Sequence, residues 1–169
     1  NIKFYNRDLV DEIIEEVGIP KEIMEKVEEG GTIAGKGAEG DVRGSFSKYA
    51  DLTDRAIHVQ KQIIRKLAEK ESCVIIGRSA DYILKDRDDV LNVFIHGDMP
   101  EKIQRIMDLY NVGEKEAVKM MADTDKRRMT NYNFYTEQKW GKASNYTLCL
   151  NSSQLGYASC EKLIMECSE

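Results

Sequence analysis

The chain has 169 residues, 41% of them hydrophobic and 33% charged, with a formal net charge of −5. These values are typical of one globular domain with a substantial core, and the negative charge argues against broad nucleic-acid binding. No apolar run approaches the length of a membrane span. The four cysteines include no C-x-x-C pair and there are only two histidines, so we expect neither a metal site nor a disulfide framework, in a reducing cytoplasm.

The first part of the chain is predicted to hold one strand and several helices. Residues 2–5 (IKFY) form a short apolar run typical of a strand, and residues 7–18 have helical spacing of apolar residues. Residues 31–49 are rich in glycine and lack a periodic pattern, which predicts a mobile loop. Residues 51–70 are predicted as an amphipathic helix. Its apolar face would consist of Ala56, Val59, Ile63 and Leu67.

The second part of the chain alternates apolar runs with helical segments. Three runs are predicted as strands, at residues 73–77, 90–96 and 147–151. Such continuous runs suit strands that are buried on both faces of a parallel sheet. One helix is expected to start at Asp98, with Glu101 three residues on in a pattern like a capping box, and others to cover about 114–135 and 157–167. The alternation predicts an α/β fold with a mostly parallel sheet.

The stretch EEGGTIAGKG (28–37) resembles a phosphate-binding loop, but its context argues against that function. A phosphate loop follows a buried strand, precedes a helix and ends in Lys-Ser or Lys-Thr. Here a charged helical segment precedes the glycines, and Gly37 stands where the hydroxyl should be. We interpret this stretch as a flexible surface loop.

Basic residues near predicted strand ends are better candidates for phosphate binding. Gly77-Arg78 directly follows a strand, where a guanidinium can hold a phosphate with two hydrogen bonds, although a lone surface arginine would give the same pattern. The segment DTDKRR (123–128) gathers three cations, and Asp125 and Arg128 share a helical face. A solvated helix face is the alternative. Trp140 is more typical of a packing anchor than of a binding platform.

Four longer stretches together resemble one family. They are FYNRDLV, CVIIGRSADYIL, DVLNVFIHGDMPEKIQRI and TDKRRMTNYNFYTEQKWGKASNYTLCLNSS. The chain is similar to the cytidylate-kinase-like family of P-loop nucleoside monophosphate kinases. The resemblance implies a three-layer α/β/α fold that uses ATP and Mg²⁺ to phosphorylate a nucleoside monophosphate, with CMP as the expected acceptor. Nucleotides would be the partners, and neither nucleic acid nor a membrane is expected.

The resemblance also implies roles for individual residues. Arg78 would hold the acceptor phosphate, Asp125 and Arg128 would match a D-x-x-R pattern at the acceptor nucleotide, and Arg127 and Arg128 would act on the transferred group as lid arginines. Arg7 would bind substrate near the acceptor site, and less secure matches are Asp81 and Arg105. Bacterial cytidylate kinases have G-R-D where this chain has Gly77-Arg78-Ser79. The guanidinium groups at positions 78 and 128 would have to converge on one pocket.

The resemblance sets the expected organisation of the chain. Residues 1–169 would form a single kinase-like domain, with 31–49 as an acceptor-side loop and 123–145 as the lid region. The family opens with a strand, a glycine-rich loop and a helix before the segment equivalent to IKFYN, so we expect the chain to be a fragment; a complete chain would have no kinase activity. Two alternatives stay open, a non-catalytic nucleotide-binding or interaction module and a kinase for another small acceptor.

Overall fold

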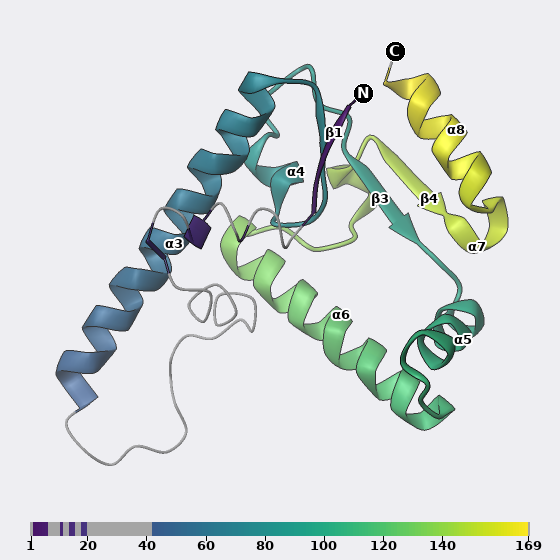
Figure 1. Cartoon of the computed structure of the whole chain (residues 1–169), viewed down its shortest axis with the longest axis horizontal. Helices are drawn as coiled ribbons and strands as arrows, with labels where there is room; N and C mark the ends of the chain where they lie inside the picture. Colours follow the sequence, from purple (N-terminus) through teal and green to yellow (C-terminus); the bar gives the residue numbers. More distant parts are fainter. Residues whose placement is uncertain (1, 7–10, 12–13, 16–17, 20–41, 169) are drawn as a thin grey trace. The chain divides into compact units, whose positions relative to one another are not determined.

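The computed structural model describes residues 2–6, 11, 14–15, 18–19 and 42–168, with the backbone alone for 42–52. It is a mixed α/β protein, composed mostly of helices with two pairs of short parallel strands (Figure 1). Its contacts define two compact units: unit 1, Asn1–Asp86 and Phe134–Thr136, and unit 2, Arg87–Asn133 and Glu137–Glu169. Among the described residues, no helix is both long and apolar enough to cross a membrane.

Unit 1 is organised around one pair of parallel strands. Its elements are β1 (Lys3–Tyr5), α3 (Val42–Lys70), β2 (Cys73–Ile75) and α4 (Ala80–Ile83). The strands pair with Phe4 opposite Val74, and the Ile76 N–H donates to the carbonyl of Tyr5 at 2.9 Å. The two strands therefore end at the same edge of the pair, and the chain leaves β2 toward α4 there.

Helix α3 supplies much of the core of unit 1. The predicted apolar face is confirmed, because Ala56 and Ile63 are buried while Val59 and Leu67 pack against the same cluster. The predicted boundary at residue 51 is wrong, because α3 begins at Val42. Residues 42–49 of the expected loop are thus helical, and residues 31–41 lie outside the described part of the chain. The spacing of Val42, Phe46 and Tyr49 in the sequence fits the helical period, a signal that the nearby glycines obscured.

The predicted burial of the strands on both faces is wrong for the described residues. Phe4 is 55% exposed, Val74 49% and Ile95 53%. Val74 lies between two more buried neighbours, whereas exposed Ile95 is followed by exposed His96, so the exposed side chains alternate with covered ones in β2 but not in β3. A continuous apolar run has no period of two, so it could not show which face lacks cover.

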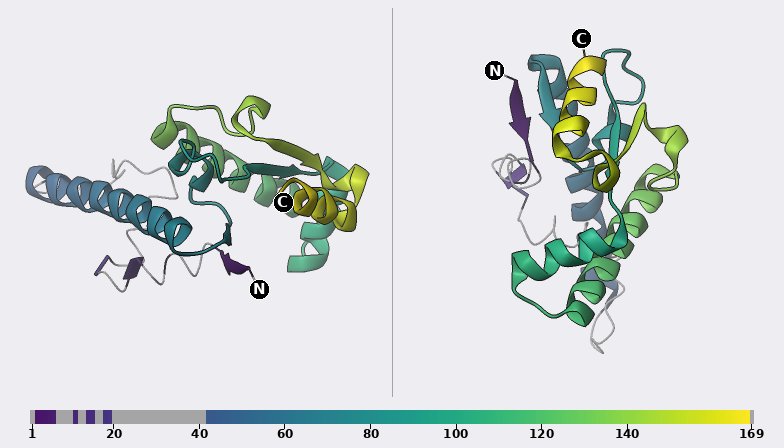
Figure 2. Two further views of the ribbon diagram at one scale, coloured as in Figure 1. Left: turned by 90° about the horizontal axis from the view of Figure 1, so that it is seen from above. Right: turned by 90° about the vertical axis from the view of Figure 1, so that its right-hand side faces the viewer.

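Unit 2 contains the second strand pair and most of the remaining helices. Its elements are β3 (Val93–His96), α5 (Met99–Tyr110), α6 (Glu114–Thr136, whose last three residues belong to unit 1), a short 3₁₀ helix η1 (Ala143–Asn145), β4 (Leu148–Asn151), α7 (Ser152–Leu155) and α8 (Tyr157–Cys167). The strands are parallel, with His96 opposite Asn151, so their carboxyl ends meet at one edge. Helix α8 lies beside this pair (Figures 1 and 2).

The helices of unit 2 confirm the predictions from periodicity. α6 and α8 match the expected ranges closely, and α5 begins directly after Asp98 as expected. α5 ends at Tyr110, and the C-cap residue Asn111 has a left-handed backbone (φ 52°) and an N–H that donates to the carbonyl of Met107. α6 then begins after Gly113. α5 therefore turns directly into α6, and Figure 1 shows the two helices meeting at the amino-terminal end of α6.

An aromatic cluster fixes the segment after α6 onto β3. The ring of Phe94 meets that of Trp140 edge to face, with 5.6 Å between centroids, and lies 4.9 Å from that of Tyr146. Gly141 has φ +71°, and a Cβ there would lie 3.3 Å from Cζ of Phe94. The backbone N–H of Trp140 donates to the side chain of Asn133 at 2.7 Å. Trp140 is thus a packing anchor, as its sequence context favoured.

Candidate functional site

Two cations, one on α5 and one on α6, contact the same carboxylate of α6. Lys102 Nζ of α5 lies 3.2 Å from Asp125 Oδ2, and Arg128 Nη1 lies 3.7 Å from Asp125 Oδ1. Arg127 Nη2 donates to Thr124 Oγ1 at 3.4 Å. We call Lys102, Asp125, Arg127 and Arg128 the α5–α6 cation cluster. With three cations and one carboxylate it keeps a positive charge that suits a phosphate group.

The α5–α6 cation cluster is open to solvent. The side chains of Lys102 and Asp125 are 37% and 39% exposed, and that of Arg128 is 64% exposed. Ion pairs at this exposure contribute little to stability, about 0–1 kcal/mol, so a ligand can exchange for the carboxylate at small cost. The cluster therefore contributes little to the stability of the fold.

Sequence reasoning found part of this cluster. The predicted shared face of Asp125 and Arg128 is confirmed by their contact one helical turn apart. Lys102 was missed, because it lies 23 residues before Asp125 and on a different helix. The sequence did place Lys102 in the first turn of a helix that follows a strand, where a cation can serve a binding site. That position does not specify which residue Lys102 contacts.

Arg105 makes a separate contact with the start of α8. Its Nη1 donates to the hydroxyl of Tyr157 at 3.0 Å, and its guanidinium carbon lies 5.8 Å from the centre of the tyrosine ring. Tyr157 is 69% exposed. The contact ties α5 to α8 and orients one more exposed guanidinium within unit 2.

A polar network joins the loops that follow β3 and β4. Asp98 accepts hydrogen bonds from Asn151 Nδ2 at 2.8 Å and Gln154 Nε2 at 2.5 Å, and its N–H donates to Ser153 Oγ at 2.8 Å. The hydrogen bond from Asn151, followed by that from Gln154, lowers the pKa of the Asp98 carboxyl. The expected capping role of this side chain is wrong, because Asp98 lies at the N-cap of α5 but its carboxylate makes no cap hydrogen bond.

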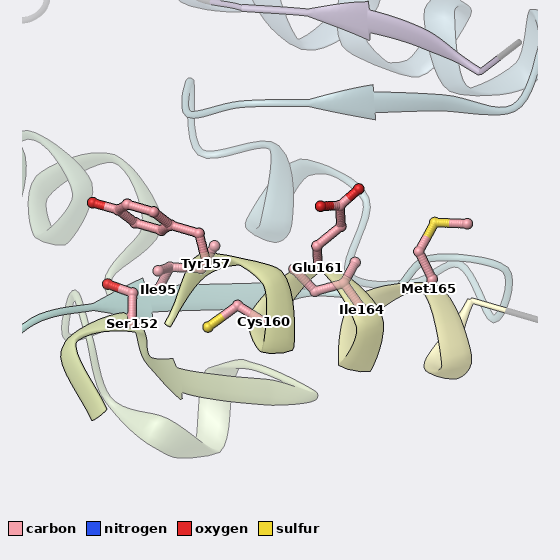
Figure 3. Close-up of a pocket in the computed structure, with 7 residues that line it drawn as sticks. All are labelled: Ile95, Ser152, Tyr157, Cys160, Glu161, Ile164 and Met165. Carbon is pink, nitrogen blue, oxygen red and sulfur yellow. The ribbon is translucent and has the colours of Figure 1, made fainter. Parts of the chain in front are cut away.

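An apolar hollow of about 330 Å³ lies on the α8 side of β3 (Figure 3). Its lining residues are Ile95, Ser152, Tyr157, Cys160, Glu161, Ile164 and Met165. The lining includes no cation, and its one charged residue, Glu161, is acidic. The hollow is therefore unsuited to phosphate and is distinct in chemistry from the α5–α6 cation cluster.

The turn after β2 holds Arg78 in an uncommon backbone conformation. Gly77, Arg78 and Ser79 all have positive φ, at 78°, 55° and 52°. Non-glycine residues seldom adopt this conformation, and such strain is concentrated at functional sites. The carbonyl of Arg78 accepts a hydrogen bond from Gln60 Nε2 of α3 at 3.2 Å. The Arg78 side chain is 5% exposed and forms an ion pair with Asp11. Sequence reasoning gave no role to Asp11 or Gln60.

The remaining predicted residues are not gathered around one point within either unit. Arg78 and Asp81 belong to unit 1, with Asp81 in the first turn of α4. Asp125, Arg127, Arg128 and Arg105 belong to unit 2. Arg7 and the stretch 28–37 lie outside the described residues. The convergence of Arg78 and Arg128 on one pocket stays a prediction.

The fold and these sites define an α/β protein with phosphate-compatible cations near its strand ends. A model of the cytidylate kinase-like family matches residues 1–154, and the chain belongs to that family. Among solved structures, an uncharacterized protein from Eubacterium ventriosum ATCC 27560 is similar, with 29% identity and a TM-score of 0.74. The match covers 99% of this chain and 83% of that one. No curated protein matches.

Proposed function

We propose that the protein is a nucleotide kinase that transfers the γ-phosphoryl group of ATP to a nucleoside monophosphate, with CMP as the acceptor. The observation that carries this proposal is the exposed carboxylate of Asp125 shared by Lys102 and Arg128, which arranges cations from two helices on one surface. Family membership supports the reaction class. A cytoplasmic location, where both nucleotides are available, is part of the proposal.

The roles of the cations follow from the charge of the reaction. Phosphoryl transfer spreads negative charge over the transferred group, and its catalysis rests on positioning and electrostatic stabilisation. Arg127 and Arg128 would stabilise that charge, and Asp125 would hold Arg128 and Lys102 in place until a phosphate takes over their contacts. Arg78 would hold the acceptor phosphate, and Arg7 would also bind the acceptor. Asp81 and Arg105 would take secondary positions.

The described residues fit ATP better than they fit a metal held by protein alone. Lys102 and Arg128 suit the phosphates of ATP, whereas among the described residues no three His, Cys, Asp or Glu side chains are grouped for a metal. Mg²⁺ commonly binds through substrate phosphates, waters and one or two carboxylates, so this arrangement is compatible with its delivery on ATP. Bound in that way, Mg²⁺ would neutralise part of the phosphate charge.

The proposal includes the arrangement of the whole chain. The two pairs of parallel strands would belong to one three-layer α/β/α fold of the P-loop kinase type, in a single domain over residues 1–169. Residues 31–49 would lie on the acceptor side, and residues 123–145 would form the lid. The sequence resemblance and the parallel pairing within each unit support this arrangement.

A coupled assay of ADP formation from ATP and each nucleoside monophosphate tests the proposal. We expect turnover to be fastest with CMP, and Arg128→Ala to lower kcat by about 100-fold, as for removal of one preorganised donor. Lys162→Ala is the matched control, because Lys162 is also exposed and paired with an acidic residue on its own helix, at 3.7 Å from Glu166. Equal activity in the two variants would refute the role of Arg128, and an absence of turnover with every acceptor would refute the kinase assignment.

A further inference from the structure

Asp98 and Lys102 lie one helical turn apart at the start of α5, and each side chain is tied to a different neighbouring element. The backbone N–H of Lys102 donates to the carbonyl of Asp98 at 3.1 Å, and Lys102 Nζ lies 3.2 Å from Asp125 Oδ2 on α6. The carboxylate of Asp98 accepts hydrogen bonds from Asn151 and Gln154, at and just after the end of β4. All of these residues belong to unit 2. A series of contacts therefore leads from the end of β4 to the α5–α6 cation cluster.

The carboxylate of Asp98 does not serve its own helix in the way that its position favours. An aspartate at an N-cap usually accepts a hydrogen bond from an N–H in the first turn of that helix, but Asp98 makes no such bond. Its Oδ1 accepts from Asn151 Nδ2 at 2.8 Å, and its Oδ2 accepts from Gln154 Nε2 at 2.5 Å. Both carboxylate oxygens thus fix the start of α5 to the end of β4.

Gly97 brings the segment after β4 close to the stem of Lys102. A Cβ at Gly97 would lie 3.1 Å from Ser153 Oγ and 3.6 Å from Lys102 Cγ. The N–H of Asp98 also donates to Ser153 Oγ, at 2.8 Å. The side chain of Lys102 therefore starts beside a backbone that the β4 segment holds, and it is 37% exposed where it reaches Asp125. Contacts outside α5 thus determine the place from which Lys102 extends toward solvent.

We propose that Asp98 is a positioning residue, which holds Lys102 where its ammonium group contacts a phosphate of ATP. This inference rests on the proposed function, which assigns Lys102 to the phosphates of ATP. Asp98 itself would not contact the nucleotide. A lysine carries its charge on a flexible stem, so the position of its backbone limits where that charge can be placed. The carboxylate of Asp98 acts on that backbone by fixing the first turn of α5.

A double-mutant cycle of Asp98→Asn and Lys102→Met in steady-state kinetics tests this role. The amide keeps the shape of the aspartate but replaces one acceptor by a donor, which would face the amide donor of Asn151 or Gln154. We expect Asp98→Asn to lower kcat/KM for ATP about 10-fold, because displacement of a group that binds substrate lowers the rate. In the Lys102→Met background the same substitution should change kcat/KM by less than about 2-fold, since the group that it positions is absent. A merely structural role would give equal losses in both backgrounds.

Asp108→Asn is the matched control on the same helix. Asp108 also accepts a hydrogen bond from a glutamine amide, Gln104 Nε2 at 2.8 Å, but this contact lies within α5 and does not reach β4. The control should leave kcat/KM for ATP unchanged. Should Asp98→Asn not fold, Gln154→Ala removes a single exposed donor to Asp98. We expect a smaller fall in kcat/KM for that variant, which Lys102→Met should again abolish.

Binding of inorganic triphosphate, measured by calorimetry, separates failure of this inference from failure of the proposed function. If the wild type phosphorylates no nucleoside monophosphate, but Asp98→Asn weakens triphosphate binding only while Lys102 is present, the kinase proposal fails and the positioning role stands. If folded Asp98→Asn keeps the wild-type kcat/KM and triphosphate affinity, or loses them equally in both backgrounds, the inference is overturned. It is also overturned if Lys102→Met alone leaves both quantities unchanged. Wild-type protein that binds neither ATP nor triphosphate overturns both proposals.

Discussion

Units 1 and 2 each place an arginine beside an aspartate, yet the two pairs differ in almost every physical respect. Arg78 is buried, lies on a strained turn after β2 and meets an aspartate 67 residues away. Arg128 is 64% exposed, lies on the regular helix α6 and meets an aspartate one turn away. The comparison shows that the same kind of pair can be a buried contact between distant parts of the chain or a solvent-exposed contact along one helix.

The largest expected difference between the two pairs is in stability. Arg78→Ala would break the buried ion pair with Asp11, and removing one partner of a buried pair typically costs about 3–5 kcal/mol. Arg128→Ala removes an exposed partner, for which about 0.5 kcal/mol or less is expected. Urea denaturation of both variants measures the free energies of unfolding. Similar losses in the two would show that the burial of Arg78 does not have the energetic weight assigned to it.

For Asp125, the carboxylate of unit 2, we expect a substitution to affect the reaction rate more than the stability of the fold. Asp125→Asn weakens the restraint on Lys102 and Arg128, so we expect kcat/KM for phosphoryl transfer to fall about 10-fold, which corresponds to about 1.4 kcal/mol. The free energy of unfolding should change by less than about 1 kcal/mol, because the pair is exposed. Steady-state assays with CMP and ATP, paired with denaturation curves, check both parts. A stability loss as large as that of Arg78→Ala would contradict the contrast between the units.

Relief of backbone strain should have a smaller effect on the free energy of unfolding, and one position in each unit allows the comparison. Ser79 in unit 1 and Asn111 in unit 2 both have φ 52°. Glycine has no left-handed penalty, whereas asparagine tolerates this region better than serine. We therefore expect Ser79→Gly to raise the free energy of unfolding by about 0.5–1 kcal/mol, and Asn111→Gly by less. Thermal denaturation of the two variants measures the difference, and a larger gain at Asn111 would count against strain in the Arg78 turn.

The smallest expected effect is a response of unit 2 to acid. The hydrogen bonds that Asp98 accepts from Asn151 and Gln154 lower its pKa in the folded protein below the ordinary 3.8. Ionised Asp98 therefore stabilises the fold above pH 3.8, and this contribution is lost as the pH falls through the lowered value. NMR of the Asn151 and Gln154 side-chain amides between pH 6 and about 2 should show their shifts moving together below pH 3.8. Asp98→Asn should abolish that transition, whereas its persistence would assign it to another group.

The sequence predicted those parts of the molecule that local patterns encode. The apolar face of α3, the ranges of α6 and α8, and the pairing of Asp125 with Arg128 all follow from the helical period. The contacts that shape the sites span longer distances, such as the 67 residues from Asp11 to Arg78 and the 53 from Asp98 to Asn151. No local period specifies such partners.

The strands mark a second limit of local patterns. Their apolar runs identified the strands but showed neither the pairing of β1 with β2 and of β3 with β4, nor which of their side chains are exposed. The left-handed turn at Arg78 was equally hidden, because only Gly77 hinted at it and neither arginine nor serine favours positive φ. Packing decides these features, so they emerge only in three dimensions.

The aromatic cluster around Phe94 gives this protein its own optical reporter. Trp140 is the single tryptophan of the chain, and its ring meets Phe94 edge to face. All indole emission therefore originates from Trp140, in the segment that follows α6 and packs against β3. A spectral shift upon addition of nucleotide would report a change at that location, so titrations can follow this part of the molecule without any attached dye.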